Sequence, residues 1–176
     1  MIYPIVIYGS QTLRNKSTDI TPDYPDLKKL IDDMFLTLDE ASGVGLAAPQ
    51  IGKNIRLFIV DCTPWADENP ELEDYRRVFI NAEIYEHSEE TDLFNEGCLS
   101  LPGLHEDVRR PVAIKMRWLD ENFEQHDELI DGLPAGGTAV FARDGAICEE
   151  LYARCPLQAK YMPGDLIGAS DIKAGP

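Results

Sequence analysis

Basic side chains are scarce in this sequence of 176 residues: 16 Lys and Arg stand against 32 Asp and Glu, a formal net charge of −16. A protein that binds DNA or RNA needs a basic surface to displace counterions from the phosphates, and binding to an anionic membrane makes the same demand. The composition therefore argues against DNA, RNA and membranes as partners. Residues 61–100 hold 12 of the acids and two bases, which predicts a solvated acidic face.

Long hydrophobic runs are also missing, since no stretch approaches the roughly 18 apolar residues that a membrane-spanning helix needs. Residues 1–7 carry no basic region and are expected to form a strand rather than a secretion signal. With 44% hydrophobic and 27% charged residues, the chain has the composition of a folded globular protein, and residues 1–176 are expected to form a single domain. Without an export signal, we expect a cytoplasmic protein whose cysteines are reduced thiols or metal ligands. The four cysteines are Cys62, Cys98, Cys148 and Cys155.

Hydrophobic periodicity predicts one helix followed by strands. Apolar residues from Leu27 to Leu38 recur at helical spacing, in a helix that Asp23 is expected to cap and that should end by Ser42. Short strands are expected at residues 55–60, 78–80, 83–85 and 112–118. A helix followed by short strands is typical of an α+β fold with antiparallel sheets.

Two segments have compositions that indicate chemistry. Residues 43–52, GVGLAAPQIG, are rich in small side chains that let the backbone approach a ligand or another strand closely, without the spacing of a dinucleotide-binding loop. Residues 95–103, NEGCLSLPG, contain Cys98 in a turn-like context. A lone cysteine is usually a small buried hydrophobe. The nearby Glu96 disfavours a thiolate, whereas a metal ion would stabilise one.

Together the two segments resemble the first two signature motifs of the peptide deformylase family, the metallohydrolases that remove the N-formyl group from new bacterial proteins. The first motif, G-x-G-x-A-A-x-Q, is matched at residues 43–50, and the second, E-G-C-L-S, at residues 96–100. The resemblance extends over about residues 1–135. It includes three further stretches: Leu13-Arg14, residues 101–111, which resemble the family's substrate-groove strand, and residues 118–122, which resemble its next hairpin.

The resemblance implies an α+β fold of antiparallel sheets packed around a C-terminal helix, and a role for each matched residue. Cys98 would bind the catalytic metal, iron(II) in the cell with zinc or nickel as substitutes. The side chain of Gln50 and the backbone N–H of Leu99 would polarise the formyl carbonyl and stabilise the oxyanion. The substrate would be an N-formylmethionyl peptide, met on nascent chains near the ribosome. The residues implied along the substrate cleft are Gly43, Gly45, Glu96 and Gly97.

The family's third motif, Q-H-E-x-x-H, is absent. Its two histidines would complete a Cys-His-His site, and its glutamate would act as the general base. The motif is expected shortly after residues 132–135, yet the sequence contains no histidine after His126. His87 is expected in an exposed acidic strand or turn, His105 in the groove strand and His126 in a hairpin, so the other two ligands and the general base stay unassigned.

Several explanations of the missing motif remain open. A reading-frame fault is one, because loss of two bases from a family-like arginine codon after Ala135 yields residues 135–139 as they stand, although Val140 does not follow from that shift. The chain could also be a catalytically inactive homologue that binds peptide N-termini, or an interaction domain that uses its acidic face. Substitute metal ligands are a further alternative, although the two cysteines among them are too far apart for chelation from adjacent helical turns. The candidate ligands are Asp144, Cys148, Glu149, Glu150 and Cys155.

Overall fold

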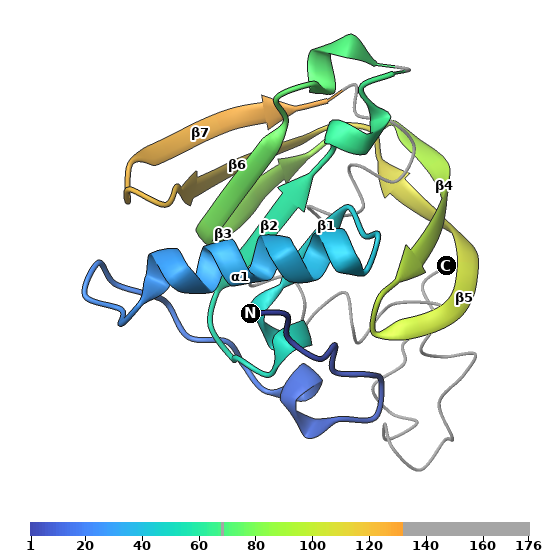
Figure 1. Cartoon of the computed structure of the whole chain (residues 1–176). Helices are drawn as coiled ribbons and strands as arrows, with labels where there is room; N and C mark the ends of the chain where they lie inside the picture. Colours follow the sequence, from blue (N-terminus) through green and yellow to red (C-terminus); the bar gives the residue numbers. More distant parts are fainter. Residues whose placement is uncertain (68, 132–176) are drawn as a thin grey trace, which may run out of the picture.

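The structure is a computed structural model that describes residues 1–67 and 69–131. Within them, the chain forms one α-helix, α1, several short 3₁₀ turns and seven strands. Five of the strands form an antiparallel sheet of order β1-β2-β3-β6-β7, and the other two form a separate β4–β5 hairpin (Figure 1). The bounds are α1 Leu27–Glu40, β1 Gly45–Ala47, β2 Leu57–Asp61, β3 Arg76–His87, β4 Thr91–Cys98, β5 Leu101–Pro111, β6 Ile114–Leu119 and β7 Gln125–Ile130. The prediction of an α+β fold with antiparallel sheets is confirmed. The expected C-terminal helix and the substitute ligands of residues 144–155 lie outside the described residues.

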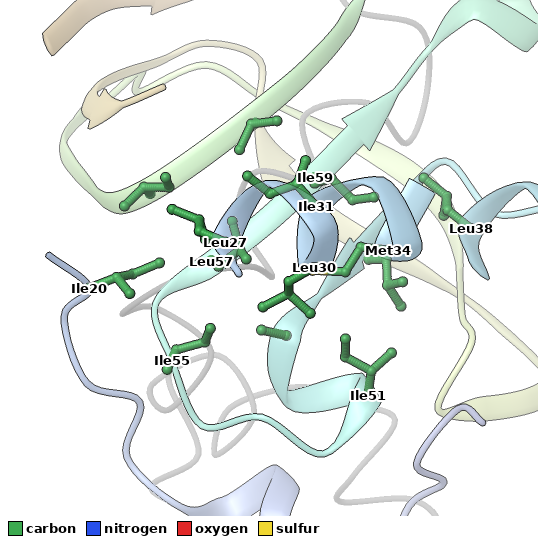
Figure 2. Packing of buried hydrophobic residues seen from close by; sticks show 14 residues of the cluster. Ile20, Leu27, Leu30, Ile31, Met34, Leu38, Ile51, Ile55, Leu57 and Ile59 are labelled. Carbon is green, nitrogen blue, oxygen red and sulfur yellow. The ribbon is translucent and has the colours of Figure 1, made fainter. Parts of the chain in front are cut away.

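Helix α1 covers one face of the sheet with the apolar stripe that the sequence predicts. Figure 2 shows Leu27 and Ile31 of the helix pointing into the same cluster as Ile59 of β2, and Met34 and Leu38 are fully buried. Burying side chains of this size contributes about 1.5–3 kcal/mol each, so this stripe fixes the helix on the sheet. In the described part of the chain, no helix is long and apolar enough to cross a membrane.

The opposite face of the sheet carries a second, more aromatic core. Phe58 stacks on Phe79 with ring centroids 4.6 Å apart, and Trp118 lies against Phe79 at 4.9 Å. Leu72 is also buried in this cluster, so the Pro- and acid-rich segment of residues 63–75 helps to cover this face. Strand β2 is buried along its whole length, because its alternate residues enter the two cores.

The segment before α1 differs from the predictions in two details. Residues 1–7 do not form a strand; instead the Val6 N–H donates to the carbonyl of Gln50 at 2.7 Å. The helix begins after Asp26, which has a positive φ of 54° and supplies only its backbone carbonyl, so Asp23 is not the cap. The Asp23 carboxylate instead accepts a hydrogen bond from the Thr21 hydroxyl at 2.5 Å.

The two short strands expected at residues 78–80 and 83–85 are one continuous strand, β3. The residue between them, Asn81, has a φ of +51°, which asparagine tolerates better than most residues. Its side chain accepts from the Ile20 N–H at 2.9 Å and donates to the Ile20 carbonyl at 2.8 Å. The irregularity therefore lies within a strand and anchors the segment that precedes the helix.

Asn81→Ala is expected to lower the free energy of unfolding by about 2–4 kcal/mol, because it leaves two polar groups of the buried Ile20 without these partners and keeps a positive φ. Asn81→Gly loses the same bonds without the backbone strain, so its loss should be smaller by about 1 kcal/mol. Urea denaturation measures both values. Unchanged stability in Asn81→Ala would contradict this account of the strand.

Candidate active site

The two motifs, distant in sequence, meet at the side chain of Gln50. Strand β1 leads into a 3₁₀ turn at Ala48–Ile51, which places Gln50 in the interior with 9% of its surface exposed. Its Oε1 accepts from the backbone N–H of Ala47 at 2.9 Å, and this bond fixes the amide so that Nε2 faces the second motif. Nε2 donates to Ser100 Oγ at 3.2 Å and lies 3.8 Å from Cys98 Sγ. The predicted pair of Gln50 and Cys98 is therefore brought together.

Leu99 and Gly43 also lie at this junction. A β-carbon at Gly43 would be 2.8 Å from Leu38 Cδ1 and 3.0 Å from Leu99 Cδ1. The absence of a side chain at Gly43 thus lets Leu99 pack beside the end of α1. Gly45 begins β1 and pairs with Val60, so the first motif lies at the edge of the sheet. It is next to the turn of residues 98–101, which we call the Cys98 turn.

The Cys98 turn joins β4 to β5, and both its flanks are bonded to other parts of the fold. Cys98 is partly exposed, whereas Ser100 is fully buried. The Ser100 carbonyl accepts from the Tyr8 N–H at 2.8 Å, so the N-terminal segment holds the turn from outside the sheet. The carbonyl-binding chemistry that the resemblance implies would lie between this turn and Gln50.

Glu96 is implied as a cleft residue, but the structure gives its carboxylate a buried partner. Arg110 Nε donates to Oε1 at 2.8 Å and Nη2 donates to Oε2 at 3.0 Å. The side chains of Glu96 and Arg110 are 2% and 8% exposed. Removing one partner of such a pair typically costs about 3–5 kcal/mol. The geometry therefore supports a structural role for Glu96 rather than contact with a ligand.

Gly97, the other implied cleft residue of the second motif, allows a close cross-strand approach. It pairs with His105 of β5, and a β-carbon at Gly97 would be 2.8 Å from the Cε1 atom of that imidazole. His105 thus lies over the backbone of the motif, in the strand where the sequence analysis expects it.

Comparison with known proteins accounts for this arrangement. The polypeptide deformylase family model matches residues 2–138. The peptide deformylase of Flavobacterium johnsoniae is 47% identical over 142 residues, which cover 77% of this chain and 72% of the relative. The chain belongs to the peptide deformylase family. Peptide deformylase from Salinibacter ruber is similarly close, at 47% identity over 141 residues, 78% of this chain and 70% of the relative.

Solved structures of peptide deformylases share the fold. The enzyme from Thermotoga maritima superposes with a TM-score of 0.72 at 31% identity, over 85% of this chain and 92% of its own. The enzyme from Legionella pneumophila gives 0.73 at 29% identity, over 91% and 90%. The family is one of hydrolases that act on formylated nascent peptides, and the resemblance stated from the two motifs is confirmed.

The described residues do not form the complete metal site of such a hydrolase. No three His, Cys, Asp or Glu side chains of residues 1–67 and 69–131 are grouped to hold a metal ion, so the prediction of Cys98 as a metal ligand stays a prediction. His87 is exposed at the end of β3. His126 stacks on Trp118 at 5.2 Å, and its Nε2 lies 3.0 Å from Asp120 Oδ2. The three histidines therefore occupy the expected strand and hairpin positions.

The sequence analysis missed two residues that support the candidate site. Ser100 belongs to the matched second motif, and this membership was the available signal in the sequence. Arg110 has no local signal, because its partner lies 14 residues earlier on another strand. Both residues are buried and stabilise the turn, and neither lies at its exposed surface.

Iodoacetamide should distinguish the two described cysteines. Burial, together with the charge of Asp61, raises the pKa of Cys62 to about 12, so at pH 8 only about one such thiol in ten thousand is ionised. Cys98 is partly exposed and should be labelled first in the folded protein. Peptide mass spectrometry measures each site, and equal labelling rates under native conditions would contradict the burial of Cys62.

Proposed function

We propose that the chain removes the N-formyl group from N-formylmethionyl peptides by metal-dependent hydrolysis in the cytoplasm, with residues 1–176 acting as one domain. Membership of the deformylase family supports this reaction. The observation that carries it is the position of the Gln50 amide, which is fixed by Ala47 and Ser100 and faces Cys98 Sγ at 3.8 Å. Iron(II) is the proposed metal, with zinc or nickel as substitutes, and nascent chains are the proposed source of substrate.

The proposed task of the described residues is to bind and polarise the formyl carbonyl. Gln50 Nε2 and the backbone N–H of Leu99 would donate to the carbonyl oxygen as negative charge develops on it. Donors that are fixed in advance need no reorganisation during the reaction, and each is commonly worth about 3–4 kcal/mol. The bond from Ala47 to Gln50 Oε1 supports this role, since it keeps the amide from rotating its oxygen toward the substrate.

A second candidate function is binding of peptide N-termini without hydrolysis. It is favoured by two observations: residues 1–67 and 69–131 contain no group of three His, Cys, Asp or Glu side chains that could hold a metal ion, and no histidine follows His126 in the sequence. If the chain binds a metal through three such side chains, at least one of them must come from outside residues 1–67 and 69–131. In that case the candidates are Asp144, Cys148, Glu149, Glu150 and Cys155.

Formate release from an N-formylmethionyl peptide, measured together with metal content, tests both functions. For the hydrolase, Gln50→Ala is expected to lower kcat about 10²–10³-fold, and Cys98→Ala should abolish both metal binding and activity. Asn95→Ala is the matched control on β4, because this exposed side chain donates across the hairpin to Asp107 at 2.8 Å, and the variant should retain activity.

The outcomes separate the candidates. Stoichiometric metal that disappears in Cys98→Ala, with formate release, supports hydrolysis. A metal-free protein that binds the formylated peptide in calorimetry, and loses that affinity in Gln50→Ala, supports binding alone. A protein that binds neither metal nor peptide overturns both, and the coding DNA would then show whether another frame encodes a histidine motif.

A further inference from the structure

The buried ion pair of Glu96 and Arg110 runs diagonally across the β4–β5 hairpin. The register places Glu96 opposite Glu106 and Arg110 opposite Asp92, so the two partners are offset by four residues. Four residues of extended strand span about 13 Å, and the strong curvature of the hairpin shortens that path (Figure 1). A bidentate fork accepts a narrow range of orientations, so the pair constrains how β4 lies along β5.

The regular register of the hairpin ends next to the candidate site. Gly97 still pairs with His105, but Cys98 pairs with Leu101, so residues 102–104 of β5 have no partners on β4 in this register. Gly103 within them has a φ of +74°. The direction of the Cys98 side chain thus depends on where regular pairing stops, because a slip of one residue turns a side chain to the other face of a sheet.

The other flank of the turn is held independently. Ser100 is bonded to Tyr8 through its carbonyl and to Gln50 through its hydroxyl. Cys98 therefore lies between two constraints: the bonds of Ser100 on one side and the ion pair on the other. Since Cys98 itself is partly exposed, a change in either flanking constraint is expected to alter the access of a reagent to its thiol.

We propose that Arg110 and Glu96 are positioning residues for the Cys98 thiol: their buried diagonal pair sets the register of β4 against β5 up to the irregular turn, and so holds Sγ beside the Gln50 amide. The inference rests on the proposed function only in taking the Cys98 turn as the site. It assigns Glu96 to the architecture of that turn instead of to the substrate cleft.

The test measures iodoacetamide labelling of Cys98 at pH 8 by peptide mass spectrometry, with Cys62 as an internal reporter of unfolding. The main variant is Glu96→Met with Arg110→Met, because replacing both partners avoids an unpaired buried charge and retains the fold more readily than a single change. Labelling of Cys98 should rise about tenfold through easier local opening of the turn, while Cys62 stays protected. Arg110→Lys keeps the charge without the fork and should give an intermediate rate.

The matched control removes an ion pair of similar form elsewhere. Arg117 donates through Nε and Nη2 to Glu83 Oε2 at 3.0 and 2.8 Å, between β6 and β3, with both side chains about half exposed. Glu83→Met with Arg117→Met should leave the labelling of Cys98 unchanged. The exposed pair thus controls for loss of an ion pair as such.

The two cysteines decide between positioning and general stability. Faster labelling of Cys98 alone supports the proposal. An unchanged Cys98 rate in the double variant, or a parallel rise at Cys62, overturns it, because the pair would then serve no local purpose at the turn or would stabilise the whole fold. The readout needs neither metal nor substrate, so a wild-type protein without formate release would overturn the proposed hydrolysis and leave this result standing.

Discussion

The candidate site depends on the three contacts of one buried amide. Gln50 is tied by its oxygen to the backbone of Ala47 and by its nitrogen to Ser100, with Cys98 Sγ 3.8 Å from that nitrogen. Each contact uses a different part of the fold, namely the end of β1, the turn after β4 and the thiol itself. Because the oxygen of an amide accepts and its nitrogen donates, the bond from Ala47 to the oxygen turns the NH₂ group toward the turn, where it donates to Ser100 and faces the thiol. Two motifs separated by about 50 residues are joined in this way.

The sheet supplies the rigid base that this junction requires. Strand β2 is buried on both faces, and β1, which carries the residues before Gln50, pairs directly with it. Side chains in interiors of this kind are packed at near-crystalline density. A displacement of β1 would therefore disturb the helix-covered core and the aromatic core together. The position of Gln50 is consequently as fixed as the core, whereas the Cys98 turn needs constraints of its own.

Local patterns in the sequence predicted the elements well and their partners less well. The stripe from Leu27 to Leu38 predicted α1 because helical burial repeats within a few residues. Residues 1–7 looked like a strand, but their bonding depends on Gln50 and Ser100, which no local pattern reveals. The prediction that Asp23 caps the helix was wrong, because the helix begins after Asp26, where the backbone turns.

The candidate site, like the fold, was predictable from the sequence only in part. The family resemblance implied the meeting of Gln50 with Cys98, because it carries three-dimensional information that a propensity does not. The role of Arg110 was not predictable, since it arises from the curvature of a hairpin and from an offset of register. The same holds for Glu96. The resemblance implied a place for it along the substrate cleft, whereas its carboxylate is bonded to Arg110 across the hairpin.

The pair of Glu96 and Arg110 also changes the electrostatic picture of the thiol. From the sequence alone, a carboxylate two residues from Cys98 opposes an anionic sulfur, and residues 61–100 add a strongly acidic background. In the fold, the guanidinium of Arg110 lies against that carboxylate with both side chains buried, so the two charges largely cancel where the dielectric is low and an uncompensated charge would act most strongly. The acidity of this segment is thus neutralised at the one position closest in sequence to the thiol. The exposed acids of residues 61–100 oppose an anionic sulfur or an electron-rich carbonyl oxygen at the turn more weakly, because solvent and salt weaken their influence over about 10 Å.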